Sequence, residues 1–163
     1  MRYLIISLLL LLGFVVKSQN SIPEVLEKYN KKTVPYINVG ELKSTNCLLL
    51  DTREPKEYKI SHIPKAIAVG YNQFNLKNLA TKIKDKKTPI IVYCSIGVRS
   101  EQIGEKLKKA GYTNVYNLYG GIFEYKNKGG KVVNSNNIET DSVHAFNKQW
   151  SVYLKKGIKV YED

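Results

Sequence analysis

The segment from Pro89 to Gly111 constrains the fold of this chain more than any other part of the sequence. Residues Ile90 to Tyr93 are all apolar and rich in β-branched and aromatic side chains, which predicts a buried strand. From Arg99 onward the apolar residues recur at helical spacing, and Gly111 lies where a helix C-cap belongs. A strand that leads directly into a helix is the repeating unit of α/β proteins.

The same alternation recurs along the chain. We expect strands at Tyr36–Asn38, Cys47–Asp51, Ala66–Val69, Ile90–Tyr93 and Asn114–Leu118. We expect helical segments at Ser21 to about Lys32, Val39–Ser44, Glu54–Ile60, Asn72 to about Lys84, Arg99–Ala110 and Asp141–Lys156. Strands that alternate with helices predict an α/β fold with a five-stranded parallel sheet and helices on both faces.

Cys94 lies between the end of the central strand and the start of its helix. A loop at this place can direct backbone N–H groups at the sulfur, and the helix N-terminus and Arg99 add positive charge. Such surroundings lower a thiol pKa from about 8.5 towards or below neutrality and produce a nucleophilic thiolate. The alternative is a buried structural cysteine. Gly97 and Arg99, which follow Cys94 closely in the sequence, favour a reactive cysteine instead. Ligands of parallel sheets also bind beyond the carboxyl ends of the strands.

Three motifs resemble those of the rhodanese sulfurtransferases and follow one another along the chain in the same order as in that family. They are Cys94-x-x-Gly97-x-Arg99-Ser100, the upstream Leu48-Leu-Leu-Asp51-Thr-Arg53-Glu54-Pro55-x-Glu57-Tyr58 with His62-Ile63-Pro64-x-Ala66, and the downstream Gly120-Gly121. The resemblance covers about residues 36–133 and implies the rhodanese-like fold. Together with the patterns at both ends of the chain, it leads us to expect a signal peptide (1–18), an N-terminal helix and lead-in (19–35), the rhodanese domain (36–133) and a C-terminal helical extension (134–163).

The resemblance implies sulfur transfer through a persulfide of Cys94. The donor is anionic, either thiosulfate-like or a persulfide, and the acceptor is a thiol or cyanide. The substrate-binding loop is expected to be Ser95, Ile96, Gly97, Val98, Arg99 and Ser100, with backbone N–H groups around the sulfane sulfur. Arg99 is expected to hold departing sulfite, and no cofactor is needed. Members that prefer thiosulfate often carry a basic residue directly after the cysteine, where this chain has Ser95.

Asp51, Arg53 and His62 are expected to support the site structurally. In the family, the Asp51 and Arg53 positions make buried ion pairs that hold loops, and the His62 position orders a turn. Direct substrate contact by the pair, and a general-base role for His62, are the alternatives. No zinc-type spacing of histidines and cysteines occurs, so we expect no metal site.

Two other functions compete with sulfur transfer. Related dual-specificity phosphatases have five residues between cysteine and arginine, whereas four residues separate Cys94 from Arg99. A tighter loop suits a single sulfur atom better than a tetrahedral phosphate. The second alternative is a non-catalytic rhodanese-like module that binds an exported redox or sulfur partner. Such modules commonly lose the cysteine, so its retention with Gly97 and Arg99 favours chemistry.

The first residues resemble an export signal. Arg2 precedes an apolar run from Leu4 to Val16 that is thirteen residues long, too short to span a bilayer comfortably. We expect cleavage before Gln19 and a periplasmic or secreted protein without membrane attachment, with an uncleaved anchor as the alternative. Cleavage would lower the net charge from +12 to +10. The lysines are spread along expected solvent-facing helix positions without interleaved aromatic platforms, as at Lys82, Lys84, Lys86 and Lys87, so we expect no nucleic-acid partner.

The two cysteines are not expected to form a disulfide. Cys47 opens one strand and Cys94 follows another. In a parallel sheet these positions lie at opposite edges, about five residues or ~16 Å apart, which exceeds the reach of a disulfide. We expect Cys47 to be a small buried hydrophobic residue and the Cys94 thiol to be free.

Overall fold

A computed structural model describes residues 21–161 of the chain. Its centre is a five-stranded parallel sheet in the order β1-β5-β4-β2-β3. The strands are β1 (Tyr36–Ile37), β2 (Leu48–Asp51), β3 (Ile67–Ala68), β4 (Ile90–Tyr93) and β5 (Val115–Leu118). All five lie within the ranges expected from the sequence.

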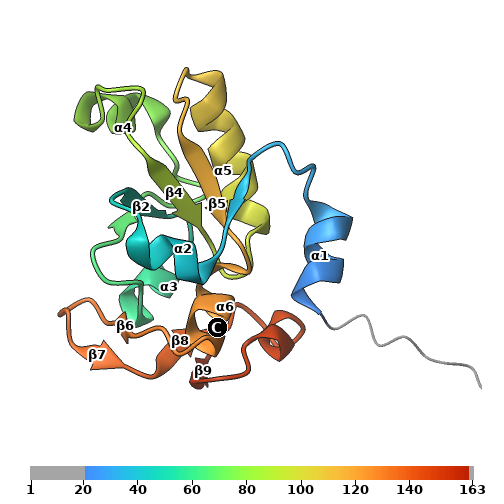
Figure 1. Cartoon of the computed structure of the whole chain (residues 1–163). Coiled ribbons are helices and arrows are strands. Elements are labelled where there is room, and N and C mark those ends of the chain that lie inside the picture. Colours follow the sequence, from blue (N-terminus) through green and yellow to red (C-terminus); the bar gives the residue numbers. More distant parts are fainter. Residues whose placement is uncertain (1–20, 162–163) are drawn as a thin grey trace, which may run out of the picture.

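Six helices accompany this sheet in residues 21–161 (Figure 1). They are α1 (Ile22–Tyr29), α2 (Val39–Ser44), α3 (Pro55–Ile60), α4 (Leu76–Lys82), α5 (Val98–Lys109) and α6 (Gly121–Asn127). Helix α6 was not predicted, and α1 and α4 are shorter than expected. Helix α1 ends early because Asn30 takes an extended conformation and caps it.

The central strand β4 is buried on both faces, and its residues divide the core in two. Ile91 and Tyr93 belong to one apolar cluster, with side chains of α2 and α6, whereas Ile90 and Val92 belong to a second cluster with α4 and α5. Successive side chains of a strand point to opposite faces. The two clusters therefore lie on opposite sides of the sheet, which confirms helices on both faces.

The helix predicted at Asp141–Lys156 is wrong. The segment instead contains β8 (Ser142–His144) and the short 3₁₀ helix η1 (Trp150–Tyr153), followed by β9 (Ile158–Val160), which pairs in parallel with β8. The apolar spacing is genuine, since Val143 and Tyr153 are buried in the core. However, β8 finds a strand partner, and Phe146 has φ of 65°, which no right-handed helix accepts.

Residues 134–137 form the turn of a hairpin between β6 (Val132–Val133) and β7 (Glu139–Thr140). The Oδ1 atom of Asn134 accepts hydrogen bonds from the backbone N–H groups of Asn136 and Ile138, and these bonds close the turn. The predicted signal peptide lies outside the described residues. Within residues 21–161 no helix is long and apolar enough to cross a membrane.

Candidate active site

The loop that follows β4 carries Cys94 at the carboxyl edge of the sheet and leads into α5. Gly97 precedes the helix with φ of 106°, a left-handed conformation that glycine adopts without steric cost. Leu26 and the backbone of Leu118 lie so close that a Cβ at Gly97 would be 3.3 Å from the Leu26 side chain. The sharp turn at Gly97 returns its own N–H towards the sulfur.

The Cys94 sulfur accepts hydrogen bonds from the helix start. The Gly97 N–H donates to Sγ at 3.2 Å, and the Ser100 hydroxyl lies 3.6 Å from Sγ. Burial by itself raises the pKa of this thiol. The Arg99 charge and the hydrogen bonds from Ser100 and Gly97 outweigh burial, and the pKa lies below its ordinary value. The site therefore favours the thiolate, which is the nucleophilic form.

Two amides behind the loop fix its shape. The Asn117 Nδ2 atom in β5 and the Asn30 Nδ2 atom both donate to the Gly97 carbonyl, at 2.8 Å and 2.9 Å. The Ser100 hydroxyl donates to Asn117 Oδ1 at 2.7 Å. A hydroxyl has one proton, so Ser100 bonds either to Asn117 or to the sulfur at any moment. Neither asparagine was predicted. The available signal was a polar side chain, Asn117, inside the predicted strand, and the structure shows that it is fully buried.

Arg99 is held by Glu57 of α3. Its two terminal nitrogens donate to the two Glu57 carboxylate oxygens at 2.7 Å and 2.8 Å, and one of them also donates to Ser95 Oγ at 3.1 Å. Burial raises the pKa of Glu57, but the hydrogen bonds and charge of Arg99 prevail and lower it. Arg99 is therefore held in an ion pair with Glu57 while its charge still lowers the pKa of Cys94, and the sequence analysis had assigned Glu57 no role.

Helix α6 supports the loop from the other side. Backbone N–H groups of Ile122 and Phe123 donate to the carbonyls of Cys94 and Ser95 at 2.9 Å and 3.0 Å. The approach requires glycine at the helix start, because a Cβ at Gly121 would lie 2.3 Å from the Cys94 carbonyl oxygen. The glycine pair in the third sequence motif thus has a steric reason.

Asp51 and Arg53 form a fully buried ion pair below the loop, with Nη2 and Oδ2 at 2.6 Å. Arg53 also donates to the Ser61 carbonyl, and the Tyr93 hydroxyl donates to Asp51 at 2.7 Å. Burial and the Asp51 charge raise the pKa of Tyr93 well above its ordinary value, so this hydroxyl remains protonated. The pair thereby connects the ends of β2 and β4 to the following turn.

His62 lies in that turn, away from the sulfur. Its ring stacks on Tyr58 with centroids 3.8 Å apart, and its Nδ1 atom is 3.1 Å from the Tyr58 carbonyl. Its backbone N–H donates to Val133 at 2.8 Å. Cys47, at the opposite edge of the sheet, is half-buried against the core, and neither it nor Cys94 is in a disulfide.

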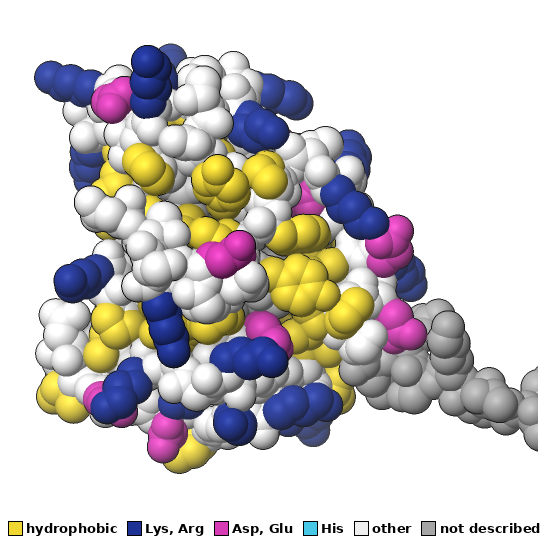
Figure 2. Space-filling view, viewed as in Figure 1, with side chains coloured by type: hydrophobic (Ala, Val, Ile, Leu, Met, Phe, Trp, Pro, Cys, Tyr) yellow, Lys and Arg dark blue, Asp and Glu magenta, His cyan; other side chains and the backbone are white. Residues whose placement is uncertain are grey.

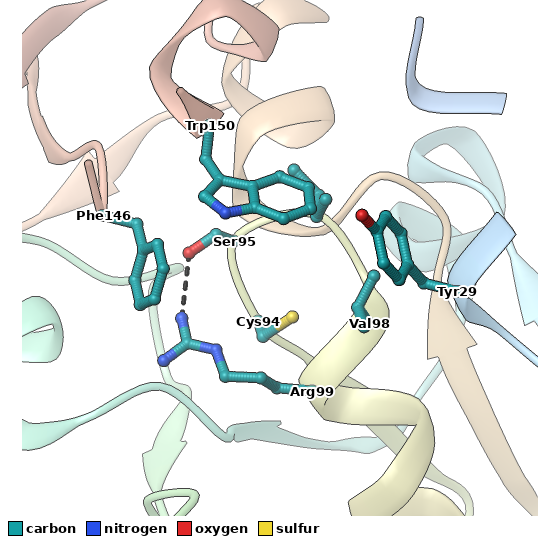
Figure 3. Close-up of a pocket in the computed structure, with 8 residues that line it drawn as sticks. Tyr29, Cys94, Ser95, Val98, Arg99, Phe146 and Trp150 are labelled. Carbon is teal, nitrogen blue, oxygen red and sulfur yellow. Dashed lines mark hydrogen bonds between the residues drawn. The ribbon is translucent and has the colours of Figure 1, made fainter. Parts of the chain in front are cut away.

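A pocket of about 170 Å³ opens above the sulfur (Figure 3). Its walls come from separate parts of the chain, and its lining consists of Tyr29, Cys94, Ser95, Ile96, Val98, Arg99, Phe146 and Trp150. The predicted loop residues Gly97 and Ser100 lie beneath the lining, against the sulfur. Asp51, Arg53 and His62 do not line it. Over residues 21–161 no cluster of three potential metal-ligating side chains occurs.

The polar surroundings of the sulfur, the loop and the sheet agree with the comparisons to known proteins. The family model described as "Rhodanese-like domain" matches residues 21–128. The chain belongs to this family. A rhodanese-like domain from Anabaena superposes with a TM-score of 0.55 at 27% identity, over 61% of this chain and 79% of that one. Thiosulfate sulfurtransferase from Pseudomonas aeruginosa shares the fold, with a TM-score of 0.58 at 23% identity, over 68% of this chain and 22% of that chain.

Curated relatives carry a different name. A tRNA uridine(34) hydroxylase from Buchnera aphidicola is 39% identical over 87 residues, which are 52% of this chain and 28% of that protein. The protein of the same name from Chlamydia trachomatis is 31% identical over 128 residues, which are 66% of this chain and 39% of that protein. The chain thus spans about a third of the length of these relatives.

Proposed function

We propose that this protein is a sulfurtransferase that carries a sulfane sulfur on Cys94. The observation that carries the proposal is the lowered pKa of a buried thiol whose Sγ accepts the Gly97 N–H at 3.2 Å. A cysteine that served only packing would have its pKa raised by burial, as occurs for Cys47. The rhodanese-like family supports the same reaction class.

In the first half-reaction the Cys94 thiolate attacks the outer sulfur of the donor. A bond forms between Sγ and this sulfur, and the donor's own bond to it breaks. The electron pair leaves with sulfite when the donor is thiosulfate, or with a thiolate when it is a persulfide. Backbone N–H groups at the start of α5 stabilise the charge on the bound sulfur. In the second half-reaction a thiol or cyanide takes the outer sulfur and Cys94 returns to the thiolate.

Arg99 contributes to this reaction through its charge next to the sulfur. To hold departing sulfite as well, its guanidinium would have to exchange one of its bonds to Glu57 or Ser95 for the anion. The reaction needs no cofactor. We further propose that residues 1–18 direct export, so that transfer takes place in the periplasm or outside the cell.

Intact mass of the purified protein tests this proposal. Incubation with thiosulfate, and separately with inorganic polysulfide, should add one sulfur atom to the protein, and cyanide should remove it. A protein that gains no sulfur from any donor would exclude the sulfurtransferase and favour a non-catalytic binding module. A stable phosphate adduct, or turnover of an aryl phosphate, would instead favour the phosphatase.

The curated relatives suggest a second candidate, participation in hydroxylation of a tRNA uridine. The specific observation in its favour is their 31–39% identity to this chain over the rhodanese-like portion. Against it, Lys and Arg side chains are scattered over the face shown in Figure 2 and do not form one continuous stripe. Filter binding of unmodified tRNA at several salt concentrations would decide, because a tRNA-binding surface gives strongly salt-dependent affinity.

A further inference from the structure

The pocket above Cys94 has a rim of three aromatic side chains. Tyr29 ends α1, whereas Phe146 and Trp150 come from the C-terminal segment that forms β8, η1 and β9. The Tyr29 and Trp150 rings touch, with centroids 5.8 Å apart. Figure 3 shows these three rings around the opening, with Val98 beside Cys94. We call Tyr29, Phe146 and Trp150 the aromatic rim.

The rim offers no free charge to a small anion. Among the residues that line the pocket, all of them within the described part of the chain, Arg99 is the single cation. Its guanidinium is bonded to both carboxylate oxygens of Glu57, and the Phe146 ring lies 4.9 Å from it. A hydrated dianion that entered would lose water without gaining an unpaired cation, which is unfavourable.

Phe146 occupies its place in the rim at a conformational cost. Its φ of 65° lies in the left-handed region, which bulky residues rarely adopt. Phe146 is the central residue of a strained three-residue turn, which the Asn147 N–H closes by donating to the Ala145 carbonyl at 2.9 Å. Its backbone N–H donates to Nδ1 of His144 at 3.1 Å, which fixes this conformation. Strain of this kind persists where the surrounding structure enforces it and is concentrated at functional sites. The strained backbone places the ring over Arg99.

The size of the pocket fits one aromatic ring next to the sulfur. Apolar protein cavities of about 150 Å³ accept benzene, and the pocket measures about 170 Å³ with Cys94 at its floor. A ligand whose thiol is joined to a ring by one carbon would place the ring against the rim. Its sulfur would then face the Cys94 sulfur.

We propose that the aromatic rim selects a thiol with an uncharged aromatic or aliphatic body as the acceptor of the sulfane sulfur. The inference rests on the proposed sulfurtransferase function and names its substrate class. The acceptor thiol first loses its proton to water, and the resulting thiolate attacks the outer sulfur of the Cys94 persulfide and forms a new S–S bond. The old S–S bond breaks, and its electron pair stays on Cys94 as the thiolate. No oxidant or reductant is consumed.

A transfer experiment compares three acceptors. Protein loaded with sulfane sulfur from thiosulfate or inorganic polysulfide is freed of excess donor and mixed with benzyl mercaptan, 2-mercaptoethanol or cyanide. Loss of one sulfur from the protein is followed by intact mass, and each thiol rate is expressed per thiolate. We expect benzyl mercaptan to react at least about tenfold faster than 2-mercaptoethanol, because only its ring is buried in the pocket.

Variants of the aromatic rim test whether the rim causes the preference for benzyl mercaptan. Trp150→Ala and Tyr29→Ala should each lower the ratio of the benzyl mercaptan rate to the 2-mercaptoethanol rate about three- to tenfold, the value of one aromatic contact. Tyr29 is 50% exposed, so its replacement tests the rim even if loss of Trp150 disturbs folding. Tyr161→Ala is the matched control, because Tyr161 is 44% exposed and lies outside the pocket lining. It should change neither rate.

Binding is measured separately from transfer. Trp150 is the single tryptophan of the chain, so its fluorescence reports directly on the rim. Benzyl methyl sulfide, which cannot accept sulfur, should change this fluorescence in Cys94→Ser protein, whereas 2-(methylthio)ethanol should not.

The outcomes distinguish the two proposals. Equal rates for both thiols, or a preference that the rim variants leave unchanged, would overturn the inference while the sulfurtransferase function stands. No gain of sulfur from any donor would overturn both proposals. A fluorescence response to the polar sulfide equal to that of the benzyl sulfide would also overturn the selection by the rim.

Discussion

The two sides of the pocket are built in opposite ways. Below, the sulfur lies in a polar cradle of hydrogen bonds, which we define as the loop from Cys94 to Ser100 together with Glu57 and Asn117. Above, the aromatic rim is apolar and its rings are partly exposed. The cradle comes from α3, the loop between β4 and α5 with the start of α5, and β5, whereas the rim comes from α1 and the C-terminal segment. Reactivity and selectivity thus belong to different parts of the chain.

The largest effect is expected from removing the sulfur on which the cradle acts. Cys94→Ser should abolish persulfide formation, because a serine hydroxyl stays protonated where the thiol ionises. Cys47→Ala is the matched control, since Cys47 lies half-buried at the opposite edge of the sheet. It should keep the transfer rate and lose only some stability. Intact mass after incubation with donor measures both, and sulfur gained by folded Cys94→Ser protein would show that another residue carries it.

The second effect concerns the support that α6 gives the cradle. Gly121→Ala would place a Cβ 2.3 Å from the Cys94 carbonyl oxygen, at φ of 55°. We expect the free energy of unfolding to fall by about 3 kcal/mol or more, from the left-handed conformation and the clash together.

The matched control is Gly129→Ala, at φ of 81° with no neighbour within 4 Å of its Cβ. This change carries only the conformational cost, about 1–2 kcal/mol. Urea denaturation of the two variants gives the difference. Equal losses of unfolding free energy in the two variants would show that α6 moves to accommodate the added Cβ and does not define the position of the loop.

A third, smaller effect is expected from changing the ion pair between Arg99 and Glu57. Arg99→Lys cannot bond to both oxygens of Glu57 and to Ser95 together, so transfer should slow about tenfold, the value of one charge-assisted contact. The loss should be equal for thiosulfate and for an uncharged persulfide donor, because Glu57 already occupies the guanidinium. The expectation from the sequence, that Arg99 holds departing sulfite, would instead give a larger loss with thiosulfate. Steady-state rates with both donors decide, and a selective loss with thiosulfate would mean that Arg99 leaves Glu57 to bind the anion.

The smallest effect is a shift in pH dependence. Only the thiolate is alkylated, so the rate of alkylation at Cys94 rises with pH and levels off above the thiol pKa. Burial opposes ionisation, but Arg99, Ser100 and Gly97 lower this pKa, so the plateau should begin below the pH of an ordinary thiol. Ser100→Ala removes one donor and should move the plateau to higher pH.

Cys47 provides the internal standard for that measurement, because burial raises its pKa and its alkylation should need a higher pH. Site-resolved mass spectrometry after iodoacetamide treatment follows both cysteines in one sample. An unchanged Cys94 profile in Ser100→Ala would mean that the Ser100 proton stays on Asn117, to which its hydroxyl is bonded at 2.7 Å.

The sequence predicted the cradle better than the rim for a physical reason. The β4 strand, the Cys94 loop and α5 are continuous in the chain, so spacing and local chemistry are sufficient to recognise them. The roles of Glu57 and Asn117 were missed because they depend on contacts with residues far away in the chain. Only the polar side chain of Asn117 within a predicted strand indicated such a contact.

The rim could not be derived from local patterns. Val143 and Phe146 occur at helical spacing, yet pairing between β8 and β9 overrides that spacing and leaves Phe146 in a left-handed conformation. The Tyr29–Trp150 contact joins residues far apart in the chain, which no periodicity indicates. The same segment gave both the wrong helix prediction and the unpredicted pocket wall.

The parallel pairing of β8 with β9 also sets an order of events during synthesis. Residues 145–157 form the crossover between the two strands and carry Phe146 and Trp150. Every strand of the central sheet ends by Leu118 and is therefore synthesised before Ile158–Val160. A nascent chain contains the Cys94 loop and Tyr29 before β9 is available to hold the crossover that carries Phe146 and Trp150. The reactive thiol is built first, and two of the three rings of the aromatic rim are fixed in place later.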